Sequence, residues 1–115
     1  MTYQIRESRI EFDNGTGVTL PFTVGDTAEV DGVLVVVLKL PPGQSMTENV
    51  LGISESGAIL WQIERIPATS IDPVANQFVT IIGHDKGTVR VSNWNGVVVD
   101  VYVETVKVKR WYWGK

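Results

Sequence analysis

Few residues in this chain have the types and spacing that catalysis needs. His84 is the single histidine and Asp85 follows it, so the two side chains are candidates for an acid–base pair. Adjacent residues of a hairpin tip usually point apart, and the surrounding loop holds no serine or second histidine. We therefore interpret His84 as an exposed turn residue. No phosphate-binding glycine loop and no nucleophile elbow is present, and we expect no catalytic site and no enzyme activity.

Three acidic residues offer the best metal ligands in the sequence. Asp26, Glu29 and Asp31 lie two to three residues apart in an expected loop, where they could hold a hard cation. They lack the glycine and the bidentate glutamate of a calcium loop, and the chain has no cysteine to supply a thiolate. We interpret them as solvated carboxylates, and we expect neither a metal nor a cofactor.

The C-terminal end combines aromatic and basic side chains. If alternation along the strand is unbroken, Val106 and Val108 face the core, and the tryptophans that follow face away from it. Trp, Tyr and Arg dominate binding hot spots. We therefore predict a protein-binding site that consists of three residues on the face away from the core and one neighbouring arginine: Trp111, Trp113, Lys109 and Arg110. The alternative is a bulge that switches the register, so that one or both tryptophans cap an open end of the fold.

The other two tryptophans have structural interpretations. Trp61 shares a predicted strand face with Ile59 and Ile63, which places it in the core. Trp94 precedes an Asn-Gly turn, and we expect it to pack on a cross-strand neighbour.

The elements that must position these residues are strands. Turn dipeptides separate runs rich in Val, Ile and Thr, which favour pleated structure. The dipeptides are Asn14-Gly15, Asp31-Gly32, Ser56-Gly57, Lys86-Gly87 and Asn95-Gly96. The predicted strands are residues 2–12, 17–24, 33–40, 49–54, 58–65, 77–83, 88–94, 97–104 and 106–113. Residues 1–115 are thus expected to form a single all-β domain, an antiparallel meander folded into a sandwich or a partly closed barrel.

At most one short helix is expected, within residues 67–76. The run Val33–Leu38 is apolar at every position, which indicates a central strand covered on both faces. The predicted core consists of Leu34, Val36, Leu38, Ile53, Ile59, Trp61, Ile63, Ile81, Val89, Val91, Val99 and Val101.

Charge and hydropathy restrict the partners. The formal net charge is −3, which disfavours a nucleic-acid-binding domain. No apolar run is long enough for a signal peptide or a membrane span, and we expect a cytoplasmic protein with no membrane partner. The acids of the first third suit a basic partner protein: Glu7, Glu11, Asp13, Asp26, Glu29 and Asp31.

One segment resembles known proteins. The hairpin Asn49-Val50-Leu51-Gly52-Ile53 to Ala58-Ile59-Leu60-Trp61-Gln62-Ile63, with the later turn Asn93-Trp94-Asn95-Gly96, is similar to small bacterial and phage all-β proteins whose activity is not established. The resemblance covers about residues 49–115 and implies a fold, not a function. The same hairpin also resembles one edge of a β-propeller blade, but the chain is too short for a full propeller.

These observations favour a non-catalytic protein-binding module. An inhibitor or immunity-type protein that occludes its partner would be a module of this kind. The first alternative is a structural subunit of a phage or a homo-oligomeric assembly, because exposed strand edges can pair between copies. The second alternative is binding of a small ligand or single-stranded nucleic acid by the aromatic-basic C-terminal strand. The net acidity of the chain argues against nucleic acid.

Overall fold

Three antiparallel sheets make up the fold in the computed structural model, which describes residues 1–64 and 76–104 and the backbone of residues 108–113. The first sheet holds β1 (Tyr3–Arg6), β2 (Arg9–Phe12) and β3 (Gly17–Thr19). The central sheet holds β4 (Thr23–Val30), β5 (Val33–Lys39), β6 (Val50–Ile53) and β7 (Ile59–Gln62). The C-terminal sheet holds β8 (Phe78–Asp85), β9 (Thr88–Asn93), β10 (Val97–Tyr102) and β11 (Val108–Trp113).

Each sheet is a meander, since its strands pair in the order in which they follow along the chain. The predicted all-β antiparallel fold is confirmed. Within the described residues no sheet closes on itself and no α-helix is present, so the fold is not a closed barrel. The helix expected within residues 67–76 falls almost wholly outside the described residues. No described helix is long and apolar enough to cross a membrane.

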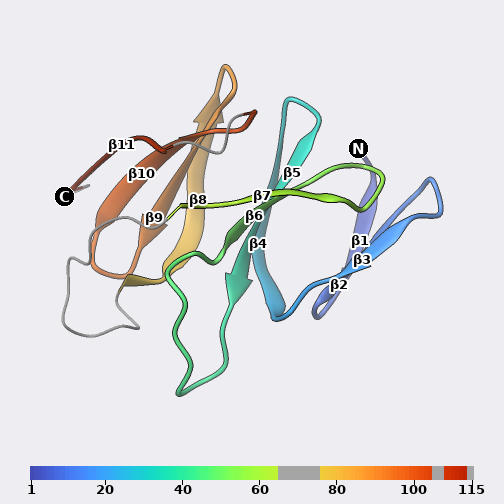
Figure 1. The fold of residues 1–115 in the computed structure, drawn as a ribbon, viewed down its shortest axis with the longest axis horizontal. Helices are drawn as coiled ribbons and strands as arrows, with labels where there is room; N and C mark the ends of the chain where they lie inside the picture. Colours follow the sequence, from blue (N-terminus) through green and yellow to red (C-terminus); the bar gives the residue numbers. More distant parts are fainter. Residues whose placement is uncertain (65–75, 105–107, 114–115) are drawn as a thin grey trace.

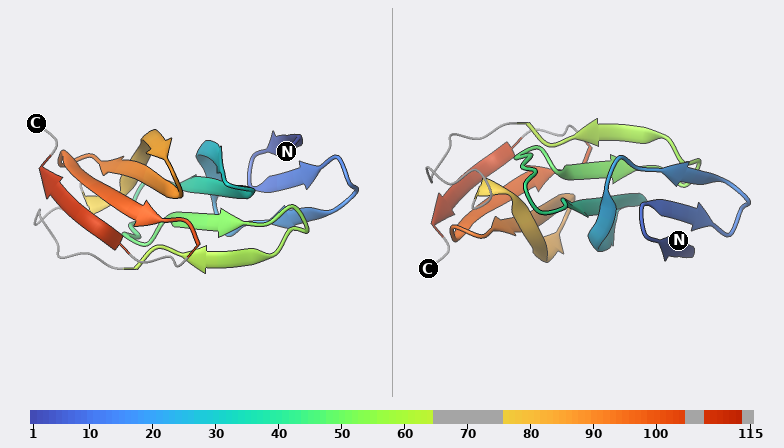
Figure 2. Two further views of the ribbon diagram at one scale, coloured as in Figure 1. Left: turned by 90° about the horizontal axis from the view of Figure 1, so that it is seen from above. Right: turned by 90° about the horizontal axis from the view of Figure 1, so that it is seen from below.

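The three sheets lie side by side along the long axis of the molecule, with the central sheet between the other two (Figure 1). Figure 2 shows β1 and β11 at opposite ends of this array. The molecule measures 42 × 34 × 19 Å, so the array is flat. Because the central sheet lies between the other two sheets, it is covered on both of its faces.

The alternation of β5 divides its side chains between two cores, as the uniformly apolar run predicted. Val35 and Val37 pack against the C-terminal sheet in a cluster that we call the C-terminal core. Leu34, Val36 and Leu38 pack against the first sheet in a second cluster, the N-terminal core. A strand with two buried faces needs apolar residues at both phases of its alternation.

Ten of the twelve predicted core residues are buried. Ile81 is only partly buried, although it packs against the C-terminal core. Ile59 is 52% exposed, so its prediction is wrong. The register of β6 and β7 shifts where Gly52 pairs with Trp61 and Ile53 with Ile59, which leaves Leu60 as an extra residue. This bulge breaks the alternation that would have placed Ile59 on the face of Trp61.

Candidate functional site

The edges of the central and C-terminal sheets meet where two strands bulge. In β4 the register against β5 shifts at Gly25, and in β8 the register against β9 shifts at Val79. A bulge bends its strand and interrupts the ladder, and bulges are frequent beside functional sites. Both bulged residues line the same depression in the surface.

Asp26 joins the two bulged strands. Its Oδ2 atom accepts hydrogen bonds from the Ile81 N–H at 2.8 Å and from the Thr80 hydroxyl at 3.2 Å. Its Oδ1 atom accepts the Thr27 N–H at 2.9 Å. The interpretation of Asp26 as a solvated loop carboxylate is therefore wrong: it lies in β4 and satisfies backbone donors of both sheets.

Asn49 holds the start of β8 against the central sheet. This side chain is fully buried. Its Oδ1 accepts the Phe78 N–H at 3.0 Å, while its Nδ2 donates to the carbonyls of Phe78 at 2.7 Å and Leu38 at 2.9 Å. The one amide of Asn49 thus links the two sheets as a pair of strand hydrogen bonds would, and it fixes Phe78, which lines the depression.

Trp94 lies in the β9–β10 turn. The Asn93 side chain accepts the Val97 N–H at 2.9 Å, and the Asn93 carbonyl accepts the Gly96 N–H at 3.2 Å. Gly96 has a φ of 85°, which a residue without Cβ adopts freely. The expectation that Trp94 packs on a cross-strand neighbour is wrong, because 71% of Trp94 is exposed. The short turn carries the residue beyond the end of the ladder.

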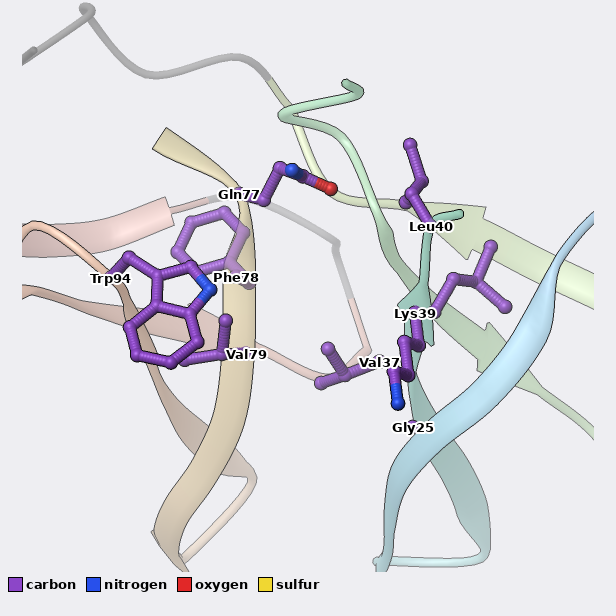
Figure 3. Close-up of a pocket in the computed structure, with 9 residues that line it drawn as sticks. Gly25, Val37, Lys39, Leu40, Gln77, Phe78, Val79 and Trp94 are labelled. Carbon is purple, nitrogen blue, oxygen red and sulfur yellow. The ribbon is translucent and has the colours of Figure 1, made fainter. Parts of the chain in front are cut away.

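These elements surround a depression of about 300 Å³, which we call the Trp94 hollow. In Figure 3, Trp94, Phe78 and Val79 lie on one side of it and Val37, Lys39 and Gly25 on the other, with Gln77 and Leu40 at one end. Its lining residues are mostly apolar: Gly25, Val37, Leu38, Lys39, Leu40, Gln77, Phe78, Val79 and Trp94. The only charged residue among them is Lys39. The sequence alone does not reveal this hollow, because its walls come from three strands and a turn that only the fold brings together.

A second depression, also about 300 Å³, lies at His84. His84 is exposed as predicted, but it belongs to β8, where it pairs with Val89, and not to the turn. No hydrogen bond joins it to Asp85 in the described structure. Arg90 donates to the buried Asp100 through two nitrogens, at 2.8 and 3.2 Å, so this carboxylate neutralises the one guanidinium at the site. The arrangement brings no acid–base pair together.

The acids proposed as weak cation ligands are dispersed. Asp26 bonds to Ile81 and Thr80 of β8, while Glu29 lies 3.4 Å from the N-terminal amine of Met1. Asp31 lies in the β4–β5 turn. Across the described residues no three His, Cys, Asp or Glu side chains are grouped to hold a metal ion.

The predicted C-terminal site lies in β11, where the structure describes the backbone alone. Trp111 pairs with Val99, Trp113 with Val97 and Arg110 with Asp100. The register then shifts, so that Val108 pairs with Val101 and Lys109 is the extra residue. The unbroken alternation on which the prediction relied is therefore absent. The side chains of Trp111, Trp113, Lys109 and Arg110 lie outside the described residues, and the contact stays a prediction.

Fold and register define the class of the protein, an all-β domain of three antiparallel meander sheets. A family model for a domain of unknown function, DUF7957, matches residues 1–112, and the chain belongs to this family. The match includes the first 48 residues, which lie outside the resemblance seen in the sequence. No curated protein matches the chain.

Among solved structures, the chain is similar to the crystal structure of the computationally designed Ika8 protein. The identity is 10% and the TM-score 0.35, over 98% of this chain and 48% of that one. The chain thus spans about half the length of the solved chain that it matches.

Proposed function

We propose that the chain is a non-catalytic protein-binding module, and that the Trp94 hollow is part of its contact surface. The observation that carries the proposal is the indole of Trp94, 71% exposed beside a largely apolar depression. Exposed Trp is the residue type most enriched in binding hot spots. A module of this kind acts by covering a surface of its partner, as an inhibitor or immunity-type protein does. An origin among bacterial or phage proteins and a cytoplasmic location belong to the same proposal.

The test compares three forms of the chain as immobilised bait in a cell lysate. Trp94→Ala should weaken the binding of a stoichiometric partner about 30-fold, which corresponds to the roughly 2 kcal/mol of a hot-spot residue. Ile5→Ala is the matched control, because Ile5 is also a large exposed apolar residue but lies on β1, outside the hollow. The proposal fails if no protein is retained in a manner that depends on Trp94.

The second candidate function is that of a subunit in an assembly of identical copies. The supporting observation is β7, an edge strand of the central sheet on which Ile59 and Leu60 are each 52% exposed. Proteins usually protect such edges with charges, and pairing between copies is another way to cover them. Leu60→Lys should then convert an oligomer into a monomer in light scattering at high concentration. A wild-type chain that is already monomeric would exclude this function.

A further inference from the structure

Another depression adjoins the Trp94 hollow, and residues at the end of β5 line both. The other depression, about 390 Å³, is lined by Phe22 and by prolines of two connecting segments; we call it the Phe22 hollow. Lys39 and Leu40 line both hollows. The two adjoining hollows, one beside the β9–β10 turn and the other beside the β3–β4 connection, are together called the groove.

The charge of this groove is concentrated at its middle. Lys39 is the only charged residue that lines either hollow. Its side chain is exposed, and within the described residues it has no ion-pair partner. On either side of the ammonium group the groove is largely apolar, with Trp94 and Val79 at one end and Phe22 at the other.

We infer that this groove binds an extended segment of a partner protein, in which an acidic residue lies between two bulky apolar residues. The acid pairs with Lys39, and the apolar side chains fill the Trp94 hollow and the Phe22 hollow. This inference rests on the proposed function and names the chemistry of the partner. The chain's net charge of −3 opposes long-range attraction of an acidic partner, so recognition depends on the local contact at Lys39.

The shape of the groove favours a chain segment over a small molecule. Small-ligand sites enclose the ligand and direct several polar groups at it. Here one ammonium group lies between two open apolar hollows, an arrangement that fixes a segment by alternate side chains. A single lysine binds a carboxylate as a point charge, whereas sites for a C-terminal carboxylate use clustered backbone N–H groups. Lys39 therefore suits an acidic side chain better than the end of a chain.

The test begins with a library of random 12-residue peptides displayed on phage and selected on the full chain. Selected peptides should share an Asp or Glu with a large apolar residue two positions before it and another two positions after it, because alternate side chains of an extended segment face the same side. Lys39→Glu should weaken their binding at least 10-fold, and changing the acid of the peptide to Lys should restore part of the loss. Lys86→Glu is the matched control, because it makes the same change of charge at an exposed turn residue outside both hollows. Lys39→Gln provides a milder variant should Lys39→Glu lower the urea midpoint.

Three outcomes would overturn the inference. Peptides that depend on Trp94 but not on Lys39 would leave the proposed function standing and remove the acidic segment. If no selected peptide depends on Trp94, the inference fails, and the lysate experiment alone decides the proposed function. A dimer of the chain that Trp94→Ala dissociates would mean that a second copy, and not a separate partner, occupies the groove.

Discussion

A buried asparagine carries the connection between two sheets of this protein. Asn49 makes three hydrogen bonds with backbone groups, of which two belong to Phe78. Asn49→Ala would leave these buried donors and acceptors without partners, and each unsatisfied group costs about 1–3 kcal/mol. We expect a loss of roughly 3 kcal/mol in the free energy of unfolding, measured with urea.

The control for this variant is Gln62→Ala. Gln62 also donates to a backbone carbonyl, that of Glu48 at 2.9 Å, but its side chain is exposed and water can replace the bond. Its loss should stay within about 0.5 kcal/mol. Equal effects of the two variants would show that the Asn49 bonds are not important for the connection.

A side chain at Gly52, in β6, would have no room. A Cβ at this position would overlap the indole of Trp61, which lies across Gly52 and donates from Nε1 to the Val103 carbonyl at 2.7 Å. Gly52→Ala must displace Trp61, and forced overpacking of this kind typically costs about 1–3 kcal/mol. Gly83→Ala is the control, since a Cβ there meets no atom within 4 Å and its φ is not positive. A smaller loss for Gly52→Ala than for Gly83→Ala in urea unfolding would contradict this packing.

At the scale of the element, Asp26 keeps two bulged edge strands together. Asp26→Ala removes the acceptor of the Ile81 N–H and of the Thr80 hydroxyl. We expect a loss of about 1–3 kcal/mol in unfolding free energy. Asp85→Ala, at an exposed position of β8, should change it by less than about 0.5 kcal/mol. Hydrogen exchange that stays unchanged at Ile81 in the Asp26 variant would count against this role.

The C-terminal strand calls for a test at the same scale. The contact predicted from the sequence requires that Trp111→Ala and Trp113→Ala leave the fold stable and weaken binding by about 2 kcal/mol each. The register pairs these positions with Val99 and Val97, both buried in the C-terminal core. Directly paired residues share a face of the sheet. A double variant that unfolds at a much lower urea concentration would therefore establish the alternative, in which the bulge returns both positions to the core face.

Turn chemistry explains which elements could be predicted. The glycines of all five predicted turn dipeptides have positive φ angles, and strands flank each of them. The turn after β1 was missed because Glu7, with a φ of 56°, adopts this conformation without being Gly or Asn. Most of β4 was also missed, since its Gly and acidic residues are poor strand formers. Pairing with the strongly apolar β5 holds them in the sheet.

The candidate site was less predictable than the fold. Alternation in the sequence identifies a buried face, but it cannot reveal a bulge, and bulges govern Ile59, Val79 and Gly25. Each inserts one residue and shifts every side chain beyond it to the other face. The Trp94 hollow depends on two such bulges and on contacts between separate sheets, which no local pattern records.

At the scale of the whole molecule, the two cores share the central sheet and should unfold together. The first sheet is attached to the central sheet by the N-terminal core and by polar contacts. The Tyr3 hydroxyl lies 2.9 Å from the Thr27 hydroxyl, and the Asn14 amide donates to the Glu55 carbonyl at 2.8 Å. Since β5 contributes to both cores, loosening one core removes support from the strand that builds the other.

Ile10→Ala tests this coupling, because Ile10 is fully buried in the N-terminal core. None of the four tryptophans lies in the first sheet, since all of them follow it in the sequence. Truncation of a buried Ile costs about 2–5 kcal/mol. With one cooperative unit, tryptophan fluorescence and far-UV circular dichroism should shift to the same lower urea midpoint. Ile5→Ala, in the same sheet but 42% exposed, should shift both signals much less. The contrary result would be a fluorescence transition of the Ile10 variant that stays at the wild-type midpoint while its dichroism becomes biphasic. The first sheet would then unfold separately, because the central sheet would remain folded without the first sheet packed against it.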